Sequence, residues 1–209
     1  MLKQLVSLAV AASSAACSVV GIRSGTEEPH FDVVGHVGGV EIRRYGERIA
    51  AETDVTGTAE DTRNAGFRRL AGYIFGANTT RSSIAMTAPV AQSSQTIAMT
   101  APVAQTSTAP GVWRIQFYMP GQYTLETLPK PNDPNVRLVV VPAVTYAVLV
   151  FSGARDGETI TKRERDLLAD LTGSPWHATG EPVAWFYDPP WTLPPLRRNE
   201  VAVPVTREP

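Results

Sequence analysis

Few side chains in this sequence could carry out chemistry by themselves. The single cysteine, Cys17, excludes an internal disulfide and a cysteine-rich metal cluster. The three histidines are His30, His36 and His177, and they form no cluster in the sequence. A lone histidine is more often a surface or hydrogen-bonded residue than a metal ligand. His36 has the most ordered setting of the three, at the start of the first predicted strand, so it is our candidate for a metal ligand.

The sequence also lacks the common catalytic motifs. It contains no GxSxG, no HExxH, no Walker loop and no glycine-rich dinucleotide turn. Glu126, which precedes Thr127, and Glu181 are carboxylates that could act as a general base. Neither has an evident catalytic partner. We therefore expect a protein without enzymatic activity.

One phrase, IAMTAPVAQ, occurs twice, at residues 84–92 and again at 97–105. Two copies are too few for a solenoid array, which needs at least three repeats. The Ala-Pro pair interrupts a helix, so we predict two short strands that are neighbours in a hairpin, with SSQT as the turn. Met86 and Met99 hold equivalent places in the two copies. They either fill the core or flank an apolar ligand.

Two helices are predicted. In residues 58–77, Thr58 is a plausible N-cap and apolar residues recur at helical spacing. Residues 156–173 form the second predicted helix, with a charged outer face and an inward face. The residues predicted on that inward face are Ile160, Leu167, Leu168 and Leu171.

Alternating or β-branched runs predict strands within 31–55, 111–120, 136–153, 182–191 and 197–205. The order is strands, helix, strands, and then strands, helix, strands again. This order indicates an α+β fold with a mostly antiparallel sheet and an internal pseudo-two-fold repeat.

Residues 1–17 have the layout of a secretory signal peptide: one lysine, a weakly apolar run, and small residues. The ending SAAC is similar to a lipobox, in which Cys17 would carry a lipid anchor; simple cleavage and an uncleaved anchor are the alternatives. All three place the folded part in the cell envelope or periplasm. We expect residues 18–30 to be a tether and 31–209 to be a single domain.

The composition narrows the range of partners. The formal charge is −1 and the pI is about 6.3, so the basic balance that nucleic-acid binding requires is missing. Apolar residues make up 43% of the chain, which is enough for a core. We expect a monomer that meets a membrane only through the possible anchor at Cys17.

Six phrases occur in order along the chain: VEIRRYGERIAAET, AGYIFGAN, the doubled IAMTAPVAQ, YTLETLPKPNDPNVRL, YAVLVFSG and YDPPWTLPPLRRNEVAV. Together they resemble the SOUL haem-binding protein family, in the form found in bacteria. The resemblance runs from about Val33 to Val205. The family resemblance implies a distorted antiparallel β-barrel flanked by two helices, similar to the effector-binding domains of bacterial multidrug regulators.

The resemblance also implies that haem or a related tetrapyrrole binds in an apolar groove beside the first helix. In this chain the implied lining is Phe67, Leu70, Ala71 and Ile74, flanked by Met86 and Met99. Haem propionates need cations, and Arg63, Arg68 and Arg69 are the nearest in sequence. The chain departs from animal members at Gly72, where they carry a basic residue.

The resemblance leaves other interpretations open. The same barrel could serve as a general ligand-binding or interaction module without haem, or as a hydrolase. Arg197 or Arg198 could contact an anion or form an Arg–Glu clamp in the sheet. Tyr187 and Trp191 could stack on a planar ligand or pack their loop against the domain.

Overall fold

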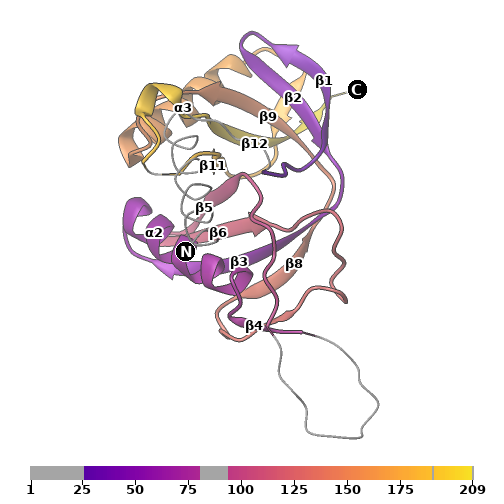
Figure 1. Cartoon of the computed structure of the whole chain (residues 1–209). Helices are drawn as coiled ribbons and strands as arrows, with labels where there is room; N and C mark the ends of the chain where they lie inside the picture. Colours follow the sequence, from indigo (N-terminus) through magenta and orange to yellow (C-terminus); the bar gives the residue numbers. More distant parts are fainter. Residues whose placement is uncertain (1–25, 81–93, 190, 209) are drawn as a thin grey trace, which may run out of the picture.

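The structure is a computed structural model that describes residues 26–80, 94–189 and 191–208 (Figure 1). The helices in these ranges are α2 (Ala59–Ile74), α3 (Gly157–Asp170) and the short 3-10 helix η1 (Pro194–Leu196). The strands are β1 (Phe31–Val37), β2 (Val40–Tyr45), β3 (Arg48–Thr56), β4 (Asn78–Thr79), β5 (Val103–Ala109), β6 (Val112–Tyr118), β7 (Lys130–Pro131), β8 (Arg137–Val141), β9 (Val144–Phe151), β10 (Trp176–Ala178), β11 (Val183–Phe186) and β12 (Asn199–Arg207).

One large antiparallel sheet dominates the molecule. Its strand order is β1-β2-β9-β12-β11-β5-β6-β3-β8, with β10 beside β12, while β4 and β7 form a separate pair. Two strands, β9 and β12, lie between β2 and β11 in this order. The ring centroids of Tyr45 on β2 and Trp185 on β11 are nevertheless 5.6 Å apart, so the sheet is strongly curved. Among the described strands the path stays open between β1 and β8. The α+β class is confirmed, but the sheet does not close into a barrel.

The strand order contains an internal repeat. Apart from the short strands β4 and β10, which follow the helices, strand, helix and two further strands recur as β3-α2-β5-β6 and as β9-α3-β11-β12. In the sheet these halves appear as β5-β6-β3-β8 and β11-β12-β9-β2, and they meet where β5 pairs with β11. Both helices lie to the left of the sheet in Figure 1, α2 against β3 and β6, and α3 against β9 and β12. This is the pseudo-two-fold arrangement expected from the order of elements.

Both helices begin as their sequences predict. The Thr58 side chain accepts a hydrogen bond from the Asp61 N–H, and the Asp156 side chain accepts one from the Thr159 N–H. Leu167 and Leu171 of the second helix are buried, but Leu168 is exposed, so its predicted inward position is wrong. Its neighbour Leu167 holds the inward position, and consecutive residues on a helix point about 100° apart.

In the described part of the chain, three apolar clusters form the core. The first joins Tyr45, Tyr118 and Trp185 inside the curve of the sheet. The second packs α2 against β3 and β6, and the third packs α3 against β9 and β12. Each helix therefore covers its own half of the sheet.

The second copy of the repeated phrase is mostly not a strand. Ile97 is buried in the α2 cluster, and only Val103–Gln105 enter β5. Those three residues pair with β6 on one side and β11 on the other, so both edges of β5 are occupied there. The hairpin-strand prediction is therefore wrong for this copy, whose Pro102 has no N–H for a ladder. The first copy, residues 84–92, lies outside the described residues.

Residues 27–30 belong to the folded domain. The Glu27 carbonyl accepts from the Ala101 N–H at 2.9 Å, and its carboxylate accepts from the Gly121 N–H at 2.7 Å. Glu28 forms an ion pair with Arg198 at 3.1 Å. The domain thus begins before Phe31, earlier than the predicted tether boundary.

The leader predicted at residues 1–17, with Cys17, lies outside the described ranges. In the described part of the chain no helix has the length and apolar character needed to cross a membrane.

Candidate functional site

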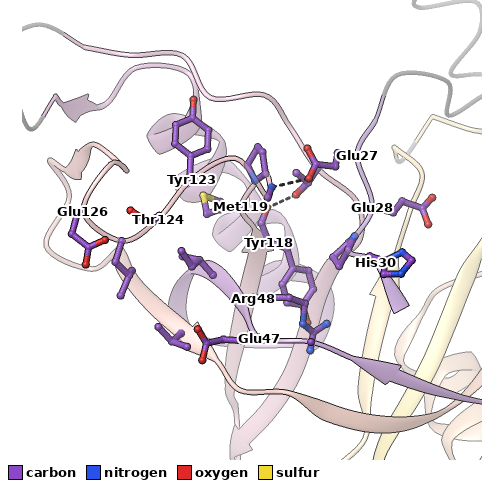
Figure 2. Close-up of a pocket in the computed structure, with 18 residues that line it drawn as sticks. Glu27, Glu28, His30, Glu47, Arg48, Tyr118, Met119, Tyr123, Thr124 and Glu126 are labelled. Carbon is purple, nitrogen blue, oxygen red and sulfur yellow. Dashed lines mark hydrogen bonds between the residues drawn. The ribbon is translucent and has the colours of Figure 1, made fainter. Parts of the chain in front are cut away.

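A cavity of about 670 Å³ opens between the N-terminal segment and the loop after β6 (Figure 2). We call it the large cavity. Residues 27–30, the β2–β3 turn and residues 118–126 form its walls. Its apolar lining includes Ile49, Tyr118, Met119, Tyr123, Leu125 and Val140. Small-molecule sites commonly have volumes of roughly 300–1,000 Å³, so this cavity can hold an organic ligand.

Arg48 lies in the wall of the large cavity and borders the aromatic core. Its guanidinium carbon is 4.5 Å from the Tyr45 ring centroid, 4.7 Å from that of Tyr118 and 6.0 Å from that of Tyr146. Its Nε and Nη2 atoms are buried and have no hydrogen-bond partner among the described residues. A buried N–H without a partner costs free energy, so this side chain favours an incoming carboxylate.

The large cavity also contains side-chain types that can coordinate iron. His30 lies at the opening, and Met119, Tyr118 and Tyr123 line the interior. Burial raises the pKa of the Tyr118 hydroxyl, which disfavours the phenolate that iron would bind. His30 and Met119 are therefore the better candidates. No cluster of three or more His, Cys, Asp or Glu side chains that could hold a metal ion occurs in the described ranges.

Carboxylates surround the opening of the large cavity (Figure 2). Glu27 is hydrogen-bonded to the backbone and Glu28 is paired with Arg198, as described above. Glu47 and Glu126 add two further negative charges from the β2–β3 turn and the loop. The opening therefore disfavours highly anionic ligands.

A second cavity, of about 270 Å³, lies between the two halves of the molecule. We call it the small cavity. Ala59 and Gly157, the first residues of α2 and α3, line it together with Trp113. Two arginines, Arg63 and Arg155, also face it, which makes it distinct in chemistry from the large cavity.

The residues predicted to line a groove along α2 are partly in the core. Leu70 and Ile74 are fully buried in the cluster between α2 and the sheet. Phe67 and Ala71 are half-buried against the same cluster, and the Phe67 ring lies 5.3 Å from that of Phe117. Arg68 is exposed on the helix. None of these residues lines the large cavity.

The other predicted site residues are dispersed. Arg63 faces the small cavity. His36 is exposed on β1, at the end of the sheet opposite β8, whereas α2 packs on β3 and β6. Met99 is 37% exposed in the second copy, and Met86 lies outside the described residues. The structure thus gathers the α2 residues and leaves His36 far from them.

The carboxylates proposed as general bases lie in different places. Glu126 lines the large cavity and Glu181 lines the small one. Glu200 is fully buried, but it accepts hydrogen bonds from Arg43, Arg198 and the Tyr187 hydroxyl. The predicted Arg–Glu clamp is confirmed for Arg198. Its carboxylate oxygens are occupied by donors from three side chains, so Glu200 is a structural residue.

Arg48 and Arg155 were missed by sequence reasoning. Arg48 meets aromatic rings that come from β2, β6 and β9, and Arg155 meets Phe186 from β11. These contacts join residues far apart in the chain. The only local signal was a basic residue at the start of a strand or helix, which is common on protein surfaces.

Solved structures define the class of domain. The C-terminal domain of EcmrR is similar, with a TM-score of 0.57 and 13% identity, covering 81% of this chain and 98% of that one. A structure described as a hydrolase from Listeria innocua has a TM-score of 0.50 and 12% identity, covering 83% of this chain and 94% of that one. At such identities the likeness shows the fold alone, which this chain shares with the EcmrR C-terminal domain.

The chain belongs to the SOUL heme-binding protein family. The family profile matches residues 26–204, nearly all of the described structure. The resemblance noted in the sequence is thus confirmed. A comparison with curated protein sequences found no match.

Proposed function

We propose that this protein binds a haem-type tetrapyrrole in the large cavity without transforming it, as a carrier or buffer. The observation that carries the proposal is a family match over residues 26–204 combined with a cavity of about 670 Å³. The unpartnered N–H groups of Arg48 at that cavity fit a ligand with carboxylate groups.

Different lining residues would contact different parts of such a ligand. Ile49, Met119 and Val140 offer apolar surface for a macrocycle, and Arg48 offers a cation for a propionate. The bound group would supply an iron centre that accepts nitrogen, sulfur or oxygen ligands. His30 and Met119 are the side chains of this cavity that would meet it.

A second place for the ligand is the surface beside α2. Phe75, at the end of the helix, is 60% exposed, and Met99 is partly exposed. Together with the half-buried Phe67 and Ala71, they supply apolar surface close to the predicted groove. The groove beside α2 that the sequence predicted is therefore our alternative location for the ligand.

A haemin titration of the full chain, followed by the Soret band, tests the proposal. Val140→Trp fills the large cavity from an exposed position, and Val150→Trp is its matched control, since Val150 is exposed on β9 and does not line the cavity. Phe75→Asp places a charge on the α2 surface. We expect saturable one-to-one binding that only Val140→Trp weakens, by about tenfold or more.

Other results would change the conclusion. If Phe75→Asp alone abolished the band shift, the α2 surface would be the site. If wild type showed a shallow, non-saturating change shared by every variant, haem would not be the ligand. The acidic opening of the large cavity favours a second candidate function in that case: a binding module for a neutral or cationic organic molecule.

We further propose a location in the cell envelope and a monomeric state. The signal-like layout of residues 1–17 and the SAAC ending support export and lipidation at Cys17. Cell fractionation of the wild type and of Cys17→Ala tests this. A lipoprotein would move from the membrane fraction to the soluble envelope fraction on substitution, and recovery of both forms in the cytoplasm would refute it.

A further inference from the structure

The small cavity lies where the two halves of the molecule meet. It is bounded by the first turns of α2 and α3 and by Gln105 of β5 and Ala184 of β11. Its volume, about 270 Å³, suits a molecule much smaller than a tetrapyrrole. It shares no lining residue with the large cavity, so it is a separate candidate site.

Two arginines form the cationic side of the small cavity. Arg63 Nη1 donates to the Arg155 carbonyl at 3.1 Å, and Arg155 Nη1 donates to the Asp188 carbonyl at 3.0 Å. Their guanidinium carbons lie 4.8 and 5.7 Å from the ring centroid of Phe186. Within the described ranges neither arginine forms an ion pair with a carboxylate.

The pKa of Arg155 is consistent with a positive charge that has no carboxylate paired to it. Burial and the positive charges of Arg63 and Arg197 lower the pKa of Arg155 to about 10. Asp188 and Glu60 act in the opposite direction, and Glu60 and Asp156 do the same for Arg63. The N-termini of α2 and α3 add partial positive charge on the same side.

Two carboxylates complete the lining of the small cavity. Glu164 lies on α3 and Glu181 lies in the turn before β11. Burial, and secondarily the charge of Glu181, raise the pKa of Glu164. In the described structure neither carboxylate pairs with a cation, so neither forms an ion pair with the arginines on the other side of the cavity. One cavity therefore holds two cations and two carboxylates, none of which has a partner ion among the described residues.

We propose that the small cavity binds a small zwitterion, with its carboxylate against Arg63 and Arg155 and its ammonium group against Glu164 and Glu181. Arg63, Arg155 and Glu164 are half-buried, whereas Glu181 is exposed at the edge of the cavity. Half-buried charges without partners are costly, and one ligand carrying both charges compensates both sets. A simple anion would leave the carboxylates uncompensated, and a simple cation would leave the arginines uncompensated. This site is independent of the tetrapyrrole function proposed above.

Isothermal titration of the full chain at low ionic strength tests the proposal. The probes are glycine, β-alanine and γ-aminobutyrate, which differ in the distance between their charges, with acetate and methylammonium as single-charge controls. We expect one of the amino acids to bind one-to-one, with a dissociation constant at least about tenfold below those of acetate and methylammonium. The Trp113 indole N–H resonance, assigned with Trp113→Phe, should shift on saturation because Trp113 lines the cavity.

Variants locate the charges that bind. Glu164→Gln and Arg155→Gln should each weaken the amino acid by about tenfold or more. The controls are Arg165→Gln on the exposed side of α3 and Glu208→Gln beside His177, and both should leave binding unchanged. If Arg155→Gln fails to fold, Arg63→Gln replaces it.

Three results would overturn the proposal. Acetate that binds as tightly as the amino acids, with no effect of Glu164→Gln, would make the cavity a simple anion site. Methylammonium that binds as tightly, with no effect of the arginine variants, would make it a simple cation site. Absence of saturable heat and of a Trp113 shift with every probe would mean no site at all, whatever the haemin titration gives.

Discussion

Arg43 and Glu200 form an ion pair that joins β2 to β12 across the intervening strand β9. Arg43 Nη1 lies 2.9 Å from a Glu200 carboxylate oxygen, and the two side chains are 3% and 0% exposed. Glu200 also accepts from the Tyr187 hydroxyl and from Arg198, each at 2.8 Å. These contacts supply the buried Glu200 carboxylate with two cations and a hydroxyl donor.

Removing the Glu200 charge should therefore be costly. Glu200→Gln leaves the Arg43 guanidinium buried without its main counter-charge, and breaking such a pair typically costs about 3–5 kcal/mol. Urea unfolding measures the change in the free energy of unfolding. Glu41→Gln removes the other, half-exposed partner of Arg43 and should cost less than about 1 kcal/mol. Equal costs for the two variants would contradict the structural role of Glu200.

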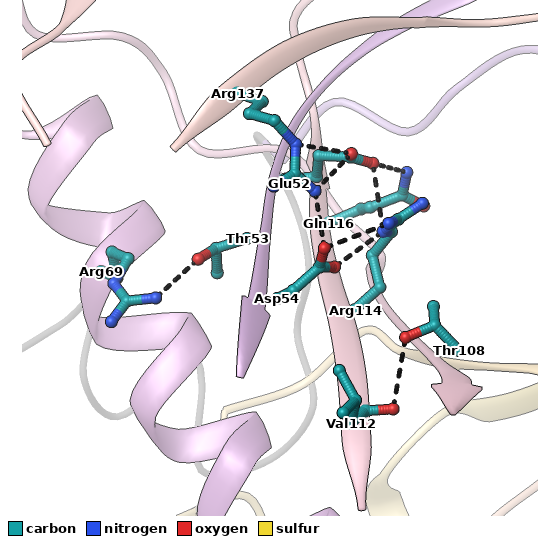
Figure 3. Close-up of polar contacts among 9 residues, drawn as sticks. All are labelled: Glu52, Thr53, Asp54, Arg69, Thr108, Val112, Arg114, Gln116 and Arg137. Carbon is teal, nitrogen blue, oxygen red and sulfur yellow. Dashed lines mark hydrogen bonds and ion pairs between the residues drawn. The ribbon is translucent and has the colours of Figure 1, made fainter. Parts of the chain in front are cut away.

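Asp54 should make stability depend on pH in the acid range (Figure 3). Its carboxylate pairs with Arg114 and Arg137, each at 2.8 Å. Hydrogen bonds from these arginines, chiefly Arg114, lower the Asp54 pKa to about 2. A depressed carboxyl pKa contributes stability that is fully present above the unfolded value, about 3.9, and is lost as the pH falls through about 2.

The test compares Asp54→Asn with wild type by urea unfolding from pH 7 to pH 2. The variant should be less stable by roughly 1 kcal/mol at pH 7, and the difference should shrink between about pH 5 and pH 2. Asp166→Asn, which removes a single exposed pair with Arg163, serves as the control. A difference for Asp54→Asn that stays constant over the whole range would be incompatible with the lowered pKa.

Gly66 is required by the contact between α2 and β6. A Cβ atom built at this position would lie 2.4 Å from Ile115 Cγ1 and 2.8 Å from Ile115 Cβ. Overpacking of this kind costs about 1–3 kcal/mol, which outweighs the helix-propensity gain of roughly 1 kcal/mol. Gly72→Ala on the same helix meets its nearest atom at 4.0 Å and should be neutral or stabilising. Thermal unfolding should rank Gly66→Ala below wild type and Gly72→Ala at or above it; the reverse order would refute the close contact.

Ile97 gives the second copy of the repeated phrase a role in the core. It is fully buried between α2 and its neighbours, so Ile97→Ala should cost about 2–5 kcal/mol. Met99→Ala, two residues further on, removes a partly exposed side chain and should cost clearly less. Chemical denaturation of both variants gives the comparison. A small effect at Ile97 would mean that this segment is not packed as described.

Local sequence patterns predicted the helices and most strands, because helix capping, apolar spacing and β-branched runs depend on residues that are near one another in the chain. Capping at Thr58 and apolar spacing define α2, and β-branched runs define β8 and β9. The hairpin prediction for the repeated phrase failed because Ala-Pro argues against a helix without requiring a strand, and the partners of β5 are β6 and β11. Strand partners are set by the tertiary fold, which a single segment does not contain.

The candidate sites were harder to predict for the same reason. The predicted groove residues Leu70 and Ile74 have an apolar pattern that serves equally for a ligand and for the core, and the sheet covers them. Arg48 and Arg155 acquire their significance from aromatic rings on other strands. Arg63 was singled out for a propionate, yet it faces the small cavity because α2 starts beside β5.

The position of β12 between β9 and β11 affects when the sheet can form during synthesis of the chain. Half of the main sheet lacks its central strand until residues 199–207 have been synthesised. Before then, β9 and β11 present unpaired backbone edges that invite association with other chains. A chain exported in an unfolded state would avoid this exposure during synthesis, and a truncation before Asn199 should yield an aggregating product rather than a smaller stable domain.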